Sequence, residues 1–219
     1  EGAVATINAS ENELFKQFMQ LVDKYRTMGV RTNADNPKDA QQAIDFGAEG
    51  IGLFRIEHMF YGENSEKPLA ILRKMILSGS TEERKHWLNE LLPYIKVAVK
   101  GTMQVMNGKP VTFRLIDPPL HEFVPHTQEN VETLAKELGI ATEELNKRIV
   151  ALEEVNPMMG LRGVRLGITY PEITETQFRA LFEAEAELRK EGFDPHLEIM
   201  VPLTISVTEL KHQKAICDR

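Results

Sequence analysis

Two arginines stand at or near the ends of short apolar runs, where their charges could meet a ligand. Arg55 comes directly after the run 51–54, and Arg114 lies in the β-branched and aromatic run 111–116, with Asp117 just beyond it. Guanidinium groups donate planar, paired hydrogen bonds to phosphate and carboxylate oxygens, and they stay charged near neutral pH. Two such groups on neighbouring strands could clamp a small dianion or trianion.

The same residues also allow a structural interpretation. Arg55 could pair with Glu57, and Arg114 with Asp117, as ion pairs that only support the fold. Networks of this kind are common in proteins, so the charges alone do not decide between the two interpretations. In both of them, orienting Arg114 is the most economical role for Asp117.

A glycine-containing run at 160–165 is a third candidate. Its sequence is Gly-Leu-Arg-Gly-Val-Arg, which places Arg162 and Arg165 beside residues that let a backbone approach a ligand closely. The chain contains neither a Walker motif nor a Gly-x-Gly-x-x-Gly motif, so a nucleotide-binding loop is not supported. The alternative is a tight loop with solvated arginines.

Other reactive side chains give weaker signals. The spacing of His121 and His126, with Pro125 between them, does not fit two zinc ligands one helical turn apart, and we predict no metal site there. His58 is expected to be a hydrogen-bonded loop residue rather than a general base. Cys217, the single cysteine, lacks activating neighbours and is expected to be inert.

Composition limits the possible partners. The chain has 219 residues, with 26 Lys and Arg against 33 Asp and Glu, and its net charge of −7 argues against a general nucleic-acid binder. A hydrophobic share of 42% suits a folded globular chain. One cysteine allows no internal disulfide, and no apolar run approaches the ~20 residues that span a bilayer. We therefore expect no membrane partner and a cytoplasmic setting, with an organelle still possible.

The elements that must position the arginines alternate between apolar strands and helices. Strand-like runs are expected near residues 30–34, 51–54, 111–116, 165 and 197–201. This order predicts an α/β fold in which helices wrap a parallel sheet. We expect one domain over residues 1–219, with the mostly helical block 60–106 as an insertion or an elaborated crossover.

Polar residues at capping spacing mark where several helices should begin. Capping-box pairs are expected at Ser10 with Glu13, Ser80 with Glu83, and Thr174 with Gln177. Asn36 followed by Pro37 predicts an N-cap and a first helical position. Pro93 predicts a kink or a break in the helix that contains it.

Three segments that carry these candidates resemble the motifs of phosphoenolpyruvate-utilising enzymes. Residues 52–60 resemble the arginine motif of that family, 156–166 resemble its third motif, and 198–203 fit the strand that follows. Residues 114–123 resemble the second motif in the form found in the pyruvate, phosphate dikinase branch. The run Asp-Pro-Pro-Leu-His-Glu-Phe at 117–123 makes that match specific, because other branches differ there.

The resemblance implies a fold, a reaction and a set of substrate-binding residues. Dikinases of this branch interconvert ATP, phosphate and pyruvate with AMP, diphosphate and phosphoenolpyruvate (PEP). By motif match, Arg55 and Arg114 would grip the transferring phosphoryl group, Arg162 would be a weaker candidate for that task, and Asp117 would support them. The fold would be part of a (β/α)8 TIM-type barrel with a helical insertion. Ile56 stands where the family usually has threonine, which removes one hydroxyl beside Arg55.

The resemblance also implies components that this sequence does not supply. Mg²⁺ is the implied cofactor, and its two carboxylate ligands and a cysteine acid would lie beyond residue 219. The implied partners are PEP or pyruvate and a phosphohistidine domain of the same parent chain, in a homodimer. A whole barrel takes ~250 residues and eight strands. With only five expected strands, we predict that these 219 residues alone are inactive.

Two other functions stay open at this point. One is a different PEP-utilising phosphotransferase of the PEP synthase type, against which residues 117–123 argue. The other is a non-catalytic anion-binding or interaction module that keeps the arginines.

Overall fold

The computed structural model describes residues 2–5, 9–62, 65–125 and 127–219, so the expectation for His126 lies outside the described residues. Its sheet is parallel, with the strands in the order β1-β2-β3-β4. The strands are β1 (Thr32–Asn33), β2 (Ile51–Arg55), β3 (Pro110–Arg114) and β4 (His196–Met200). The predicted α/β fold with a parallel sheet is therefore confirmed.

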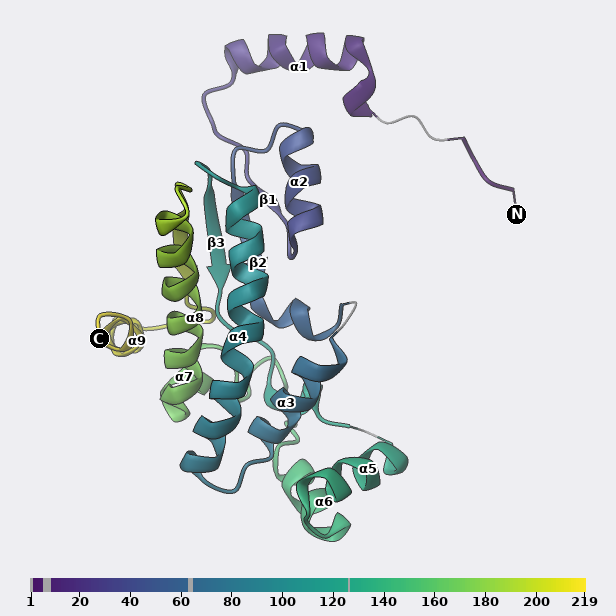
Figure 1. The fold of residues 1–219 in the computed structure, drawn as a ribbon, viewed down its shortest axis with the longest axis vertical. Coiled ribbons are helices and arrows are strands. Elements are labelled where there is room, and N and C mark those ends of the chain that lie inside the picture. Colours follow the sequence, from purple (N-terminus) through teal and green to yellow (C-terminus); the bar gives the residue numbers. More distant parts are fainter. Residues whose placement is uncertain (1, 6–8, 63–64, 126) are drawn as a thin grey trace.

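Helices make up most of the remaining structure (Figure 1). The α-helices are α1 (Glu13–Tyr25), α2 (Pro37–Asp45), α3 (Glu66–Ile76), α4 (Thr81–Val105), α5 (Gln128–Leu138), α6 (Thr142–Ala151), α7 (Val164–Thr169), α8 (Pro171–Lys190) and α9 (Val207–Cys217). Short 3₁₀ helices are η1 (Ala9–Glu11), η2 (Ile56–Phe60) and η3 (Leu120–Phe123). The block 60–106 is mostly helical, as predicted. The strand expected near residue 165 is wrong, because α7 occupies that position.

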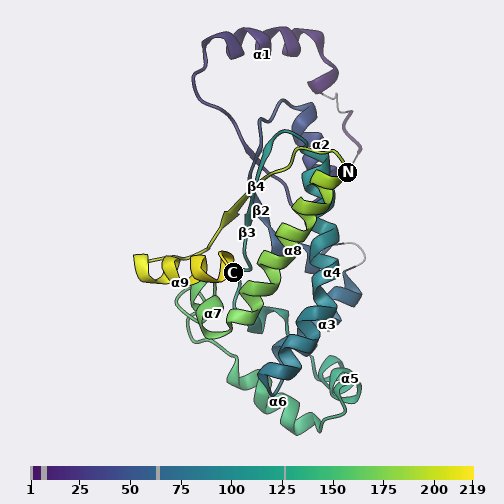
Figure 2. The ribbon, with the colours of Figure 1, turned by 60° about the vertical axis from the view of Figure 1, so that its left-hand side comes forward.

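Packing makes the two faces of the sheet different. Phe54 of β2 and Phe113 of β3 are at most 1% exposed, and their ring centroids lie 4.8 Å apart. The long helices α4 and α8 run side by side along the sheet, and α3 packs on α4 (Figures 1 and 2). On the other face, Arg31 and Glu198 form an ion pair with side chains that are 40% and 44% exposed.

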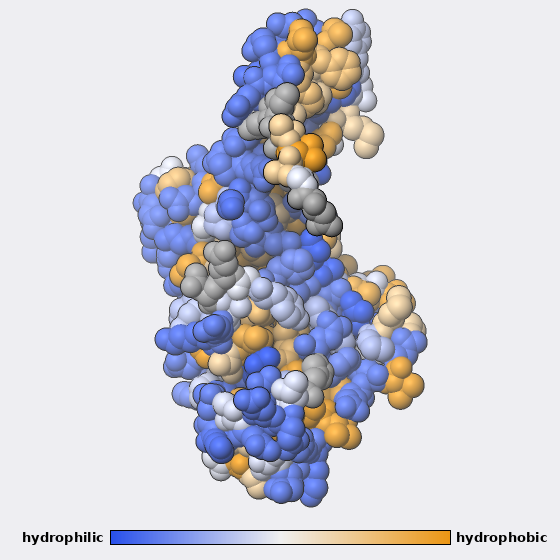
Figure 3. Space-filling view, turned by 90° about the vertical axis from the view of Figure 1, so that its right-hand side faces the viewer, coloured by the Kyte–Doolittle hydropathy of each residue, from blue (hydrophilic) through white to orange (hydrophobic). Residues whose placement is uncertain are grey.

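Helix α1 stands apart from the sheet (Figures 1 and 2). Its side chains are all at least partly exposed, and several large apolar ones face solvent at that end of the molecule (Figure 3). Asn12 caps this helix, since its Oδ1 accepts from the amide of Leu14 at 3.0 Å and from that of Phe15 at 3.3 Å. Helix α1 therefore begins after Asn12 and not after the expected Ser10, whose side chain lies outside the described part of the structure.

The other expected helix starts have mixed outcomes. Asn36 caps α2 through the amide of Asp39, with Pro37 as the first helical residue, as predicted. Ser80 accepts from the amide of Glu83 at 3.1 Å, but the Glu83 carboxylate accepts from Gly79 instead of Ser80, so the box is incomplete. Helix α4 continues through Pro93 without a break.

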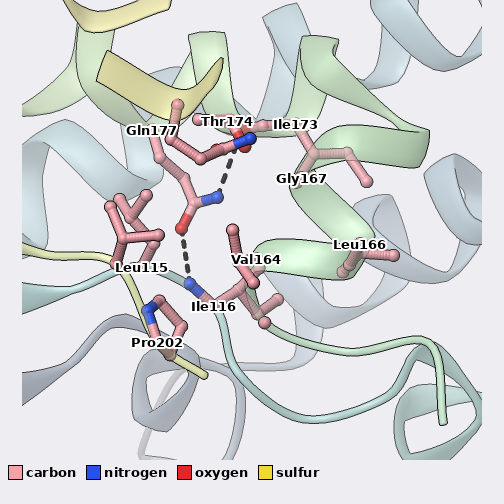
Figure 4. Close-up of a pocket in the computed structure, with 12 residues that line it drawn as sticks. Leu115, Ile116, Val164, Leu166, Gly167, Ile173, Thr174, Gln177 and Pro202 are labelled. Atoms are coloured by element: carbon pink, nitrogen blue, oxygen red, sulfur yellow. Dashed lines mark hydrogen bonds between the residues drawn. The ribbon is translucent and has the colours of Figure 1, made fainter. Parts of the chain in front are cut away.

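Gln177 does not cap a helix start, contrary to the prediction for Thr174 and Gln177. Helix α8 begins earlier, at Pro171, and both residues lie buried inside it. The Gln177 amide instead joins the helix to the end of β3 (Figure 4). Its Oε1 accepts from the amide of Ile116 at 2.7 Å, and its Nε2 donates to the carbonyl of Ile173 at 3.2 Å.

None of the helices in the described ranges is both long and apolar enough to cross a bilayer.

Candidate anion-binding site

The two arginines meet at one edge of the sheet. Arg55 is the last residue of β2 and Arg114 the last of β3, and the strand register pairs them directly. Paired residues of adjacent parallel strands project on the same face of the sheet. The structure thus places the two arginines that the sequence singled out next to each other, at the carboxyl ends of neighbouring strands.

Asp35, which follows β1, holds Arg55 in two ways. Its Oδ1 accepts from the backbone amide of Arg55 at 2.7 Å, and its Oδ2 lies 3.0 Å from Nη2 of the same residue. The same Oδ2 lies 3.0 Å from Nδ1 of His58. Arg55 therefore pairs with Asp35 and not with Glu57, the partner that the structural interpretation expected. His58 contacts the same carboxylate.

Arg114 lies between two carboxylates. Its Nη2 donates to Glu57 of η2, and its Nη1 lies 3.1 Å from Oδ2 of Asp117. That Asp117 oxygen also accepts from Nη2 of Arg162 at 2.9 Å, and the Asp117 carbonyl accepts from Nε of Arg162 at 3.2 Å. The expected Arg114–Asp117 pair is present, and Asp117 joins Arg114 to Arg162.

The backbone conformation of the glycine-containing run at 160–165 helps to position Arg162. Gly163 has φ of 57°, a conformation that few side chains adopt, and a Cβ there would lie 3.0 Å from the carbonyl of Pro202. Its amide donates to the carbonyl of Asp117 at 3.2 Å. Arg165 instead donates to two carbonyls of its own loop, at 2.6 and 2.8 Å, and so holds the loop's conformation.

The two carboxylates that contact Arg114 are buried. The Glu57 side chain is 3% exposed and that of Asp117 is 8% exposed. Burial raises the pKa of the Glu57 carboxyl, because water can no longer solvate its charged form. Several buried polar atoms have no hydrogen-bond partner among the described residues. They include Nε of Arg55, Nε of Arg114, Oε2 of Glu57 and Oδ1 of Asp117.

The hydrogen-bond donors of Arg55 and Arg114 differ in whether they have partners. Each guanidinium has five N–H donors, and the two carboxylates on Arg114 are bound through its Nη atoms. Nε of Arg114 and Nε of Arg55 have no partner among the described residues, but both atoms are buried. A ligand at the strand ends would therefore meet the exposed parts of the two guanidinium groups, whose side chains are 20% and 31% exposed.

Sequence reasoning missed Asp35 as a site residue. The signal was available, because Asp35 follows the strand run 30–34 and the same strand-end argument selected Arg55. Glu57 was considered only as a partner for Arg55, since sequence spacing favours close neighbours. Its true partner, Arg114, lies on the adjacent strand.

Comparison with known proteins identifies the family to which this chain is similar. Residues 9–219 match the family described as PEP-utilising enzyme, PEP-binding domain. The chain is 47% identical over 217 residues to pyruvate, phosphate dikinase of Clostridium symbiosum, covering 99% of this chain and 24% of that protein. It is 44% identical over 218 residues to the Giardia intestinalis dikinase, covering 100% of this chain and 24% of that protein.

A plant relative extends the comparison. The chain is 50% identical over 198 residues to the chloroplastic pyruvate, phosphate dikinase 1 of Arabidopsis thaliana, covering 90% of this chain and 20% of that protein. The resemblance to the dikinase branch is thus confirmed. The chain spans about a quarter or less of the length of these relatives. Through the match over 9–219, it belongs to the family of phosphoenolpyruvate-utilising enzymes, in the region of their PEP-binding domain.

Proposed function

We propose that this chain is the N-terminal portion of the PEP- and pyruvate-binding barrel of a pyruvate, phosphate dikinase. Such an enzyme interconverts ATP, phosphate and pyruvate with AMP, diphosphate and PEP. The observation that carries the proposal is the register of Arg55 with Arg114 at the strand ends, within a chain that matches the PEP-binding domain. Every dikinase compared above supports this branch of the family over the PEP synthase type.

The architecture supports a partial barrel. Four parallel strands follow one another in sequence order, and the long helices α4 and α8 run along one face of their sheet. In a (β/α)8 barrel the helices lie outside, the other face lines the interior, and ligands bind at the carboxyl ends of the strands. We assign residues 1–219 to one such domain, with the helical block 60–106 as its insertion.

The arginines would act on the transferring phosphoryl group. Phosphoryl transfer depends on positioning and on stabilising the charge that spreads over the phosphoryl oxygens. Arg55 and Arg114 would contact these oxygens, and Arg162 would add positive charge from the neighbouring loop. Asp117 would hold Arg114 and Arg162 in place through the Oδ2 atom that both of them contact.

The described residues do not fit a Mg²⁺ site. They contain no group of three or more His, Cys, Asp or Glu side chains that could hold a metal ion. We propose that the Mg²⁺ ligands and the acid cysteine lie outside this chain, together with the phosphohistidine domain that would deliver the phosphoryl group. The parent enzyme would be a homodimer, in the cytoplasm or an organelle.

Arginine substitutions in the full-length dikinase test the proposal. Arg55→Ala and Arg114→Ala should each lower kcat/KM by about a thousandfold, because each removes preorganised donors to the transition state. The measurements are steady-state kinetics and calorimetric titration with phosphonopyruvate. Arg179→Ala is the matched control, since Arg179 lies on α8 with a 53% exposed side chain and pairs with Glu183.

Two results would count against the proposal. One is near-normal kinetics in either arginine variant. The other is pyruvate-dependent turnover by the pure 219-residue chain with ATP, phosphate and Mg²⁺, because the proposal predicts none.

A further inference from the structure

Asp35 carries three polar contacts on one carboxylate. Oδ1 accepts from the Arg55 amide at 2.7 Å, and Oδ2 lies 3.0 Å both from Nη2 of Arg55 and from Nδ1 of His58. The Asp35 side chain is 14% exposed, whereas those of Arg55 and His58 are 31% and 42% exposed. The carboxylate that the other two side chains share is therefore the most buried of the three groups.

The backbone on both sides of Asp35 is fixed. Ala34, just before it, is 3% exposed, and its amide donates to the carbonyl of Leu53 in β2 at 3.3 Å. Asn36, just after it, caps helix α2 through the amide of Asp39 at 2.8 Å. Asp35 is thus held between the end of a strand and the start of a helix, and it can serve as an anchor for longer side chains.

We propose that Asp35 is a positioning residue of the anion site, an inference that rests on the proposed function. Its carboxylate holds the Arg55 guanidinium at the strand end before the ligand arrives. An arginine side chain is long and has many rotamers, and a reacting group displaced by about 1 Å can lose about a hundredfold in rate. Anchoring the guanidinium through Asp35 limits that displacement.

The same carboxylate sets the protonation pattern of His58. A carboxylate can only accept hydrogen bonds, so the 3.0 Å contact favours the tautomer of His58 that carries its proton on Nδ1. Nε2 of the neutral ring is then an acceptor. Asp35 and His58 both line a surface groove with Met59 and Tyr61, and Asp35 and Arg55 both line a second groove toward α1 and α2. Asp35 therefore lies at the border between the grooves and contacts one side chain that lines each of them, His58 in the first and Arg55 in the second.

Asp35→Asn separates this role from a merely structural one. The variant keeps an oxygen for the Arg55 amide but removes the charge that holds the guanidinium and His58. In the full-length dikinase we expect kcat to fall by about tenfold to a hundredfold. KM should change by less than about threefold, because two effects on anion binding oppose each other. The lost orientation of Arg55 weakens binding, and the loss of a nearby negative charge strengthens it. Asp39→Asn is the matched control, since its carboxylate contacts Asn36 and not the arginine.

A double-mutant cycle tests whether Asp35 acts through Arg55. If it does, Asp35→Asn should lower kcat no further in the Arg55→Ala background. Independent, additive losses would overturn the inference. So would a wild-type kcat in Asp35→Asn while Arg55→Ala and Arg114→Ala remain impaired, and in that case the proposed function would stand. Wild-type behaviour of the two arginine variants would instead refute the proposed function.

A measurement on the unmodified enzyme keeps the inference testable even where Asp35→Asn fails to fold. The ¹⁵N resonances of the His58 ring distinguish the two neutral tautomers. We expect the proton on Nδ1 in the unmodified enzyme. A ring with its proton on Nε2 and a bare Nδ1 would contradict the contact with Asp35.

Discussion

Two ion-pair networks in this molecule join basic to acidic side chains in different surroundings. The first, here called the strand-end network, consists of Glu57, Arg114, Asp117 and Arg162. The second, here called the helix ladder, joins α4 to α8 through Lys96, Lys100, Glu183, Glu187 and Glu191. The carboxylates of the ladder are 38–47% exposed, whereas those of the strand-end network are 3–8% exposed.

Because the two networks differ in exposure, the pKa values of their carboxyl groups shift in opposite directions. Hydrogen bonds from Lys96 and Lys100 lower the pKa of Glu187 to about 2, because solvent still stabilises the charges and the lysines add to that. Burial raises the pKa of Glu57, although Arg114 pulls in the other direction. The strand-end network also retains buried atoms without partners among the described residues. The ladder therefore suits a purely structural role, and the strand-end network is where the proposed function places the ligand.

The largest effect on stability should come from Asp117→Ala. This change removes one carboxylate from two arginines, Arg114 and Arg162, each with a 20% exposed side chain. We expect a loss of about 3 kcal/mol in the free energy of unfolding, at the lower end for a broken buried pair because Arg114 keeps Glu57. Urea denaturation measures it. A loss no greater than that of Glu187→Ala would contradict the distinction between the networks.

The sequence alone predicted where the two arginines lie in the fold. One apolar run that ends just before Arg55 and a second run that contains Arg114 were enough to predict that both lie at or near strand ends, and parallel strands share one carboxyl edge. The partners were harder to predict. Arg55 pairs with Asp35, which lies one strand earlier, and Arg114 pairs with Glu57 across the sheet. Such contacts depend on register and on side-chain direction, which residue spacing alone does not determine.

Helix boundaries show the same limit. Thr174 and Gln177 have the spacing of a capping box, but α8 already begins at Pro171. Tertiary contacts place Gln177 instead against the amide of Ile116. The run near residue 165 looked like a strand because of its apolar residues, but glycine conformation at Gly163 turns the chain into α7. Local pattern predicted the strands that carry the site better than the loop that completes it.

A smaller effect is expected from Gln177→Ala. Gln177 is 4% exposed, and its loss leaves the Ile116 amide without its acceptor at the end of β3. A buried donor without a partner costs about 1–3 kcal/mol, and the middle of that range lies below the loss of about 3 kcal/mol expected for Asp117→Ala. Thermal and urea denaturation both measure the loss. Gln128→Ala is the control, because it removes the same side chain from an exposed position on α5, where its amide donates to Glu132. A loss in Gln177→Ala no greater than in the control would refute the assigned role.

The pH dependence of stability should change in opposite directions in the two networks. The folded pKa of Glu57 lies above its ordinary value of 4.5, so its contribution is full below pH 4.5 and is lost as the pH rises through the folded pKa. The folded pKa of Glu187 is about 2, so its contribution is present above pH 4.5 and is lost as the pH falls toward 2.

Unfolding free energies between pH 3 and 7 measure both contributions. The difference between the wild type and Glu57→Gln should decrease as the pH rises. The difference between the wild type and Glu187→Gln should increase over the same interval. Slopes of the same sign would show that burial does not separate the two networks.

The smallest effect should come from Lys100→Ala in the helix ladder. Lys100 lies 2.9 Å from Glu187 and 2.7 Å from Glu191, but its side chain is 24% exposed and Glu187 keeps Lys96. Exposed pairs contribute little, and salt screens them, since the Debye length is about 3 Å at 1 M ionic strength. The urea midpoint should shift less than in Gln177→Ala, and the shift should disappear in 1 M salt. The loss in Asp117→Ala should persist in that salt because the Asp117 carboxylate is only 8% exposed. If salt removed both losses equally, then the charges of the strand-end network would be as well solvated as those of the ladder, and burial would not be what prepares that site for an anion.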